Sequence, residues 1–317
     1  YELVNLVSWA GRCVYETDYG QLAALRLPDP VIDLPPPLRW TPAEAAAVQD
    51  RPLARAMKLA AAAGATQLFS QLALALDDQL TTPGEHALLS ALARDLGQPA
   101  VAVRTAKTGL GKGVIATDAA FPLPVLPDGV TGPGRAEAAL SLAITRQESE
   151  FNTFAVSSAG ARGLMQLLPS TAQMEARALG LQYSFSGLTN DPSYNMTLGA
   201  GHLYRLVNDF GGSYILAIAA YNAGPTRVRQ WLNEFGDPRG GGVDPIDWVE
   251  MIPFSETRNY VQRVLENVQV YRYRLADRPT PIRLAEDLSR GQGRSGWGST
   301  PGRWIAPTQP TAAPAGT

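Results

Sequence analysis

A glutamate on the apolar face of a predicted helix is the residue in this sequence best suited to acid–base chemistry. Positions spaced i, i+4, i+8 and i+11 share one helical face, and here they are Leu140, Ile144, Glu148 and Phe151. Glu150 is rotated about 200° from Glu148 by the helical repeat, so we expect it to face water. A carboxylate on an apolar face must be paired, or it keeps its proton through a raised pKa. Such a glutamic acid can donate a proton near neutral pH, which cleavage of a glycosidic bond requires.

The competing interpretation is that Glu148 is structural and pairs with a core arginine. Arg146 and Arg162 are the candidate partners. For an isolated glutamate this interpretation is favoured, because buried charges in proteins are usually paired. The residues that follow Glu148 reverse that preference.

The composition argues against several function classes. The chain has 317 residues, 45% of them hydrophobic, which is enough for two domains or one large one. The net charge is −2, and no basic stripe indicates a nucleic-acid partner. Cys13 is the only cysteine, and the two histidines, His86 and His202, lack metal-ligand spacing. No apolar run approaches the roughly 20 residues of a membrane span. We therefore expect no transmembrane segment, no internal disulfide and no metal site.

Proline-rich stretches divide the chain into four predicted parts. Residues 1–40 comprise the end of an upstream helical region and a Pro-rich linker, and because they open in a helical pattern without Met we expect a processed or truncated product. Residues 41–130 have the pattern of stacked helical hairpins, and residues 131–278 form a second helical unit. Residues 279–317 are a C-terminal extension with little periodicity, and its distal part is expected to be disordered.

Helix-start signals mark the elements of both helical parts. Thr41-Pro42-Ala43-Glu44 combines an N-cap, a proline at the first helical position and an acid in the first turn. In the second part, helices are expected to begin at or near Arg135, Pro169, Pro192, Ser213, Pro225 and Ser255. Residues 152–163 have no period and are predicted to be loop, and residues 247–253 are expected to be irregular. The short apolar helix after Ser213 should be the buried centre of this part.

Three motifs follow one another in the second part. The first is Glu148-Ser149-x-Phe151-Asn152, continued by Ser157 and Gly160-Ala161-x-Gly163-Leu164-Met165-Gln166. The second is Ala220-Tyr221-Asn222-Ala223-Gly224-Pro225, and the third is Ile252-Pro253-Phe254-Ser255-Glu256-Thr257-Arg258-x-Tyr260-Val261. Together they resemble the signature of the soluble lytic transglycosylases of the lysozyme superfamily. Residues 41–120 also look like the helical linker domain that precedes the catalytic domain in the large soluble enzymes. Thr153 departs from the family, which usually has Pro there; this changes a loop constraint and leaves the acid intact.

The resemblance implies a fold and a reaction. The fold is mainly α: a helical-hairpin domain followed by a lysozyme-like catalytic domain with a small amount of β structure. The reaction is cleavage of the MurNAc–GlcNAc β-1,4 bond of peptidoglycan without water, which leaves a 1,6-anhydro-MurNAc end. Glu148 is the single acid/base by position, and the substrate N-acetyl group takes the place of a second carboxylate. The implied partner is the peptidoglycan glycan strand, the implied location is the periplasm, and neither a cofactor nor a metal is needed.

A hydrolase would need a second acid about 5–10 Å from the first. Apart from its helix neighbour, the nearest acids after Glu148 are Glu175 and Asp191. Glu175 lies inside a predicted helix and Asp191 has the position of an N-cap, so neither is an obvious nucleophile. The sequence is therefore compatible with a single-acid mechanism.

The resemblance also suggests substrate-binding residues in the first motif. Ser157 and Gln166 would hydrogen-bond the substrate acetamide and position Glu148, and the alternative is local backbone bonding. Met165 would line the sugar subsite or fill the core.

Further substrate-binding residues are suggested in the second and third motifs. The Tyr221 hydroxyl needs a partner if buried, and Glu148 or the acetamide is expected. Asn222 would contact substrate or cap its own helix. Glu256 would line the groove, although a helix start alone explains an acid there. We expect Arg258 and Tyr260 to be mainly structural.

Two other functions remain open at this point. One stays within the fold: a lysozyme-like hydrolase that uses water. The other is a helical scaffold whose lysozyme-like unit binds glycan without cleaving it. The products released from peptidoglycan distinguish the three possibilities.

Overall fold

The computed structural model describes residues 18–291 except 27–29, 33, 35, 112–113, 115 and 133–134. The expectations for the first residues of the chain and for the distal tail lie outside the described residues. Within the described part the protein is mainly helical, which confirms the predicted fold class. None of its helices combines the length and apolarity needed to cross a membrane.

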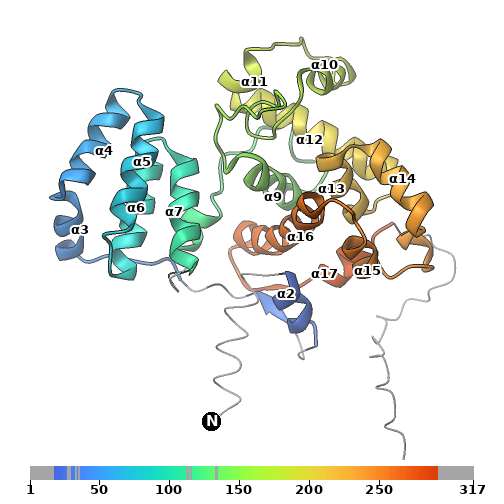
Figure 1. The fold of residues 1–317 in the computed structure, drawn as a ribbon, viewed down its shortest axis with the longest axis horizontal. Coiled ribbons are helices and arrows are strands. Elements are labelled where there is room, and N and C mark those ends of the chain that lie inside the picture. Colours follow the sequence, from blue (N-terminus) through green and yellow to red (C-terminus); the bar gives the residue numbers. More distant parts are fainter. Residues whose placement is uncertain are drawn as a thin grey trace, which may run out of the picture.

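The first half forms helical hairpins, drawn in blue to green in Figure 1. Its helices are α3 (Pro42–Gln49), α4 (Pro52–Ala62), α5 (Thr66–Asp77), α6 (Pro83–Asp95), α7 (Pro99–Gly111) and α8 (Thr117–Ala120). The predicted start at Thr41 is a complete capping box, in which Thr41 and Glu44 satisfy each other's backbone N–H groups. Thr82 and Glu85 form a second capping box at α6. These helices bury their own apolar core, which includes Phe69, Leu76 and Leu89.

The second half is arranged around α16, which packs against α9 and α13 near the middle of the molecule (Figure 1). Its helices are α9 (Ala138–Ser149), α10 (Pro169–Ala178), α11 (Gly187–Asn190), α12 (Pro192–Asp209), α13 (Tyr214–Ala223), α14 (Pro225–Phe235), α15 (Pro245–Glu250) and α16 (Ser255–Ala276), with the 3-10 turn η1 (Pro238–Gly240). Helix α13 is buried from Tyr214 to Ala220, so it is the predicted apolar centre. Between α9 and α10, two isolated β-bridges pair Arg162 with Val156 and with Leu167.

The two halves share α7. The core of the helical hairpins reaches Ala102, whereas Val103 and Ala106 on the same helix belong to the main core. One face of α7 therefore packs on the hairpins and another on the second half, so this helix links the two units.

Residues at both ends of the described chain pack onto the main core. Helix α2 (Asp18–Ala24) lies against α16, and β1 (Val31–Ile32) pairs antiparallel with β2 (Thr280–Pro281), with Ile32 opposite Thr280. Helix α17 (Leu284–Ser289) follows, and Leu284 is buried in the main core. Although the sequence after residue 278 has little periodicity, residues 280–289 thus contain a strand and a helix. Residues 247–253, expected to be irregular, contain most of α15.

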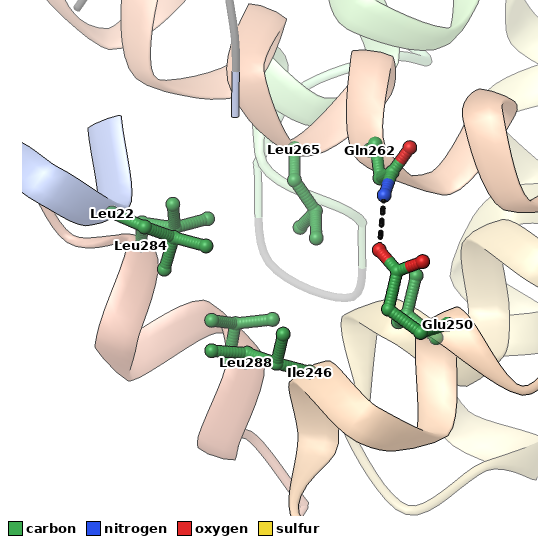
Figure 2. A pocket seen from close by; sticks show the side chains of 8 residues that line it. Leu22, Ile246, Glu250, Gln262, Leu265, Leu284 and Leu288 are labelled. Atoms are coloured by element: carbon green, nitrogen blue, oxygen red, sulfur yellow. Dashed lines mark hydrogen bonds between the residues drawn. The ribbon is translucent and has the colours of Figure 1, made fainter. Parts of the chain in front are cut away.

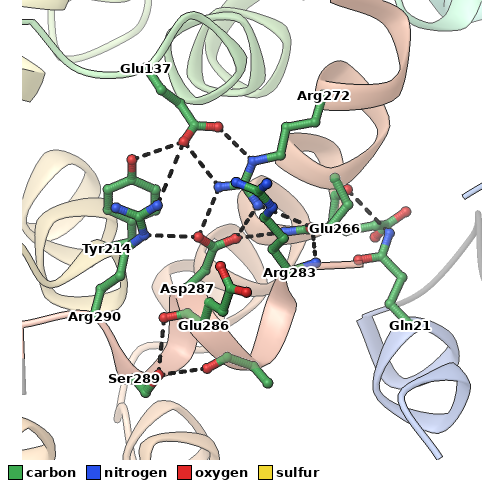
Figure 3. A network of polar contacts seen from close by, with 12 residues as sticks. Gln21, Glu137, Tyr214, Glu266, Arg272, Arg283, Glu286, Asp287, Ser289 and Arg290 are labelled. Atoms are coloured by element: carbon green, nitrogen blue, oxygen red, sulfur yellow. Dashed lines mark hydrogen bonds and ion pairs between the residues drawn. The ribbon is translucent and has the colours of Figure 1, made fainter. Parts of the chain in front are cut away.

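A buried polar network fastens this C-terminal segment (Figure 3). Arg272 on α16 donates to Glu137 at 2.7 Å and to Asp287 at 2.6 Å, and Gln269 also donates to Asp287 at 2.7 Å. The side chain of Asp287 is fully buried. Arg290 bonds to Asp287 at 3.0 Å, so a single carboxylate is held by three donors.

Candidate active site

Glu148 lies in the last turn of α9, with its side chain partly buried. The apolar face predicted around it is real, because Leu140, Ile144 and Phe151 are all buried. Burial raises the pKa of Glu148 to about 7. The carboxylate of Glu256 adds to this rise in the pKa, whereas a hydrogen bond from Tyr260 opposes it. Glu148 is therefore placed and tuned to hold a proton near neutral pH.

Tyr260 on α16 donates its hydroxyl hydrogen to Oε1 of Glu148 at 2.5 Å. The ring is buried, and the pKa of its hydroxyl is raised well above the usual value by burial. Tyr260 was predicted to be mainly structural, and the structure corrects this prediction because the tyrosine bonds to the candidate acid. A signal was present, because Glu256 and Tyr260 are spaced i, i+4 and so share a helical face.

The arginines proposed as structural partners of Glu148 are engaged elsewhere. Arg146 donates to the carbonyl of Ala120 at 2.7 Å and to Asn267 Oδ1 at 2.9 Å. The guanidinium of Arg162 lies 4.3 Å from the centre of the Phe185 ring. The structural ion pair considered for Glu148 is thus contradicted.

Glu150 was expected to face water, and this was wrong. Its carboxylate accepts hydrogen bonds from Lys107 at 2.6 Å and from Arg104 at 3.1 Å, both on α7. Helix α9 ends at Ser149, two residues earlier than predicted, and Glu150 adopts a left-handed conformation directly after it.

The loop after α9 is fastened from two sides. Ser149 donates its hydroxyl hydrogen to the carbonyl of Leu164 at 2.7 Å, which returns the loop to the helix end beside Glu148. Asn195 on α12 accepts from the Met165 backbone N–H at 2.8 Å and donates to the carbonyls of Arg162 and Leu188. Asn195 was not predicted, because it lies near the start of another helix, 30 positions from Met165, and its own neighbours do not indicate the partner.

The residues of the first motif make contacts within this loop. Ser157 Oγ accepts from the Ala161 N–H at 3.0 Å, and Gln166 donates to the carbonyls of Ala155 and Gly163. These are the local backbone bonds considered as the alternative. Met165 is fully buried, and its sulfur lies 2.4 Å from where a side chain on Gly199 would begin. The Met165 side chain therefore lies in the core, which is the second of the two roles considered for it.

The second and third motifs meet at the same end of the domain. Tyr221 donates its hydroxyl hydrogen to the carbonyl of Met165 at 2.8 Å, not to Glu148. Burial raises the pKa of Tyr221, and the charge of Glu148 raises it further, which shows that the two groups are close. Asn222 accepts from Thr257 at 2.6 Å and thereby ties the end of α13 to the first turn of α16. Glu256 is exposed in that same turn.

The two acids weighed as possible nucleophiles have structural partners, as expected from their positions. Glu175 is buried against Arg205 at 2.7 Å and His202 at 3.0 Å, and Asp191 caps α12. The acid whose charge Glu148 senses is instead Glu256, 108 positions further on in the numbering. The acids nearest to Glu148 in the sequence are therefore not the acid whose charge raises its pKa.

Two hollows in the described part of the chain lie away from Glu148. One has a volume of about 30 Å³, is lined mainly by aliphatic side chains and lies where α2, α15, α16 and α17 meet (Figure 2). The other, of about 620 Å³, lies between the start of α9 and residues 278–283. No described group of three or more His, Cys, Asp or Glu side chains is arranged to hold a metal ion.

The comparisons with known proteins agree with the geometry. Residues 133–240 match the family described as the transglycosylase SLT domain, and residues 251–279 match the soluble lytic transglycosylase helical domain. The chain contains a transglycosylase SLT domain. All of the first and second motifs lie within the SLT match. The third lies within the helical-domain match, which covers the whole of α16.

Relatives of known name share the same region. A soluble lytic murein transglycosylase of Escherichia coli strain K12 is 42% identical over 147 residues, which are 46% of this chain and 22% of that protein. The chain thus spans about a fifth of that relative's length.

Solved structures extend the likeness beyond the SLT domain. The 70-kDa soluble lytic transglycosylase of Escherichia coli superposes with a TM-score of 0.70 at 29% identity, over 86% of this chain and 43% of that one. An inactive mutant of the lytic transglycosylase Slt from Pseudomonas aeruginosa gives a TM-score of 0.71 at 34% identity, over 84% of this chain and 42% of that one. The fold of the helical hairpins is therefore shared as well.

Proposed function

We propose that this chain is a lytic transglycosylase that cleaves the MurNAc–GlcNAc β-1,4 bond of peptidoglycan and leaves 1,6-anhydro-MurNAc ends. The observation that carries the proposal is Glu148, whose pKa is raised to about 7 by burial and whose carboxyl accepts a bond from Tyr260. It lies in an SLT domain whose relatives are named soluble lytic murein transglycosylases. Because peptidoglycan is the substrate, we place the enzyme in the periplasm.

In the first step, protonated Glu148 gives its proton to the glycosidic oxygen as the bond from that oxygen to C1 of MurNAc breaks. The substrate N-acetyl group stabilises the positive charge at C1. In the second step, the Glu148 carboxylate takes the proton from the C6 hydroxyl as that oxygen bonds to C1. The proton returns to Glu148, no water is consumed, and the enzyme is restored.

The neighbours of Glu148 fit these two steps. A hydrogen bond donated by Tyr260 favours the carboxylate that exists between the steps, and it also fixes the orientation of the carboxyl group. The charge of Glu256 favours the protonated form that begins the reaction. We retain Ser157, Gln166, Tyr221, Asn222 and Glu256 as proposed residues of the substrate groove.

A second candidate function is hydrolysis, and the proximity of Glu256 specifically favours it. A second carboxylate near the acid could activate water or attack C1, as in hydrolases with two carboxylates. Glycan binding without cleavage is the remaining alternative.

Mass spectrometry of muropeptides released from purified sacculi tests the proposal. We expect ends that lack one water relative to reducing ends, and no products from Glu148→Gln with an unchanged circular dichroism spectrum. Reducing ends would instead establish hydrolysis, and an absence of products from the unmodified protein would leave binding only.

Glu256→Gln separates the first two functions further. For a transglycosylase we expect anhydro ends to persist and the basic limb of the pH–rate profile to move to lower pH, because a negative charge that raises the pKa of Glu148 is removed. For a two-carboxylate hydrolase the same variant would lose activity.

A further inference from the structure

The helical-hairpin unit reaches the residue two positions after the candidate acid. Lys107 on α7 donates to Glu150 Oε1 at 2.6 Å, and Arg104, one turn earlier, donates to Oε2 at 3.1 Å. The Glu150 side chain is only 20% exposed. Both oxygens of one carboxylate are thus held by cations from another part of the chain.

These ion pairs lie where the backbone is strained. Glu150 has φ 52° and Phe151 has φ 66°, so two consecutive residues with side chains occupy the left-handed region. That conformation is disfavoured for residues other than glycine and persists only where surrounding contacts impose it. Phe151 is buried, which fixes one of the two residues, and the cations of α7 fix the other.

Electrostatics indicates that the pairing is more than a surface contact. Burial alone would raise the pKa of Glu150, but the bonds and charges of Lys107 and Arg104 hold it below its usual value. Burial lowers the pKa of Lys107, as expected for a cation withdrawn from water. A partly buried pair of this kind is screened less by solvent than an exposed one.

We propose that Lys107 and Arg104 are positioning residues, which hold Glu150 so that the end of α9 keeps Glu148 buried against Tyr260. The proposal rests on the proposed function for its kinetic readout. It gives the helical-hairpin unit a direct part in the reaction, because α7 supplies both cations. Disrupting the pairs would let the last turn of α9 fray and admit water to Glu148.

The sign of the expected pH effect separates this role from a direct charge effect. The groups that face Glu148 are Tyr260 and Glu256 on α16 and Tyr221 on α13. Those that face Glu150 are Lys107 and Arg104 on α7, with Arg146 on its own helix. Loss of positioning hydrates Glu148 and lowers its pKa, so the basic limb moves to lower pH. Removing a cation that acted on Glu148 directly would raise that pKa and move the limb to higher pH.

The test compares Lys107→Met, Arg104→Gln and the double variant with the unmodified protein, which must first cleave sacculi. We expect the double variant to lose about 10- to 100-fold in kcat with little change in KM, and its basic limb to shift to lower pH. Lys107→Arg keeps the positive charge, so it should retain the kcat and the basic limb of the unmodified protein. Arg51→Gln is the matched control, because it breaks an ion pair with Glu85 inside the helical hairpins and should leave kcat and the limb in place.

Glu150→Ala is a decisive companion variant, because it keeps the left-handed strain while removing the carboxylate. We expect it to lose kcat as the double variant does; full activity in Glu150→Ala would overturn the proposal. The proposal also fails if the double variant melts at a lower temperature but keeps its kcat and pH profile, or if the limb moves to higher pH.

A readout independent of activity keeps the proposal testable if the proposed function fails. The dependence of thermal stability on pH is measured for each variant with and without Glu148→Gln. In the unmodified protein, the effect of Glu148→Gln on the melting temperature should differ between pH 5 and pH 8. We expect that difference to be smaller in the double variant. An undiminished difference would contradict the positioning role, whichever reaction the protein performs.

Discussion

Glu148 is subject to two opposing influences, burial and a hydrogen bond. Burial withdraws the carboxyl from water and disfavours its charge, whereas the Tyr260 hydroxyl stabilises that charge. The outcome, a pKa of about 7, lets one group act first as an acid and then as a base.

The first prediction concerns stability. Because the pKa of Glu148 is raised from 4.5 in the unfolded chain to about 7, its contribution to stability is complete below pH 4.5 and is lost as the pH rises through 7. The neutral side chain in Glu148→Gln avoids that loss. We expect the variant to match the unmodified protein near pH 4 and to be more stable by about 3 kcal/mol near pH 8.5. Urea unfolding at both pH values measures this, and an equal difference at the two would contradict it.

The second prediction separates the two tyrosines near Glu148. Tyr260→Phe removes the donor that lowers the pKa of Glu148, so the basic limb of the pH–rate profile should move to higher pH. We also expect kcat to fall about tenfold, since the carboxyl loses its fixed orientation. Tyr221→Phe is the comparison, because its hydroxyl bonds to the Met165 carbonyl; it should cost about 1 kcal/mol of stability and leave the limb in place. A limb that moves equally in both variants would refute the assignment.

At the scale of elements, the site depends on a loop pressed against α12. Gly163 has φ 76°, and a side chain there would begin 2.0 Å from the carbonyl oxygen of Leu188 and 2.4 Å from Nδ2 of Asn195. Only glycine allows this approach, and it is the approach that lets Asn195 bond to Met165 and Arg162.

The third prediction follows from that contact. Gly163→Ala should destabilise the protein by about 3 kcal/mol or more and reduce cleavage, because the loop must move away from α12. Gly160→Ala is the control: its φ is 82°, but no atom lies within 4 Å of the added carbon, so only backbone strain of about 1 kcal/mol is expected. Thermal denaturation compares the two, and equal losses would show that the close contact is unimportant.

At the scale of the whole molecule, the two ends of the described chain close on the central helix α16. Strands β1 and β2 pair, α2 and α17 pack beside them, and the Arg272 network joins α9, α16 and α17 (Figures 1 and 3). Residues 280–289 are thus part of the folded unit that carries Glu148.

The fourth prediction tests this closure. Asp287→Ala leaves the Arg272 guanidinium, which is 12% exposed, with Glu137 as its remaining acidic partner in the network, so we expect a loss of about 3–5 kcal/mol. Asp95→Ala removes an exposed pair with Arg94 and should change stability by less than about 0.5 kcal/mol. Urea unfolding measures both. An unchanged midpoint for Asp287→Ala would show that the C-terminal segment is dispensable.

The local features of this protein follow from its amino-acid sequence alone. Helix starts at Thr41 and Pro169, the buried α13 and the apolar face around Glu148 all follow from hydrogen bonds and periodicity within a few residues. The order of the three motifs also indicated the SLT domain before its geometry was known.

Only the tertiary structure decided which distant groups meet. Tyr260 reaches Glu148 across 112 positions, Lys107 reaches Glu150 across 43, and β2 pairs with a strand near the other end of the described chain. Such pairings depend on how helices and strands pack, and a residue's own neighbours in the sequence do not encode the partner. For that reason the acid could be predicted from the sequence, whereas the groups that tune and hold it could not.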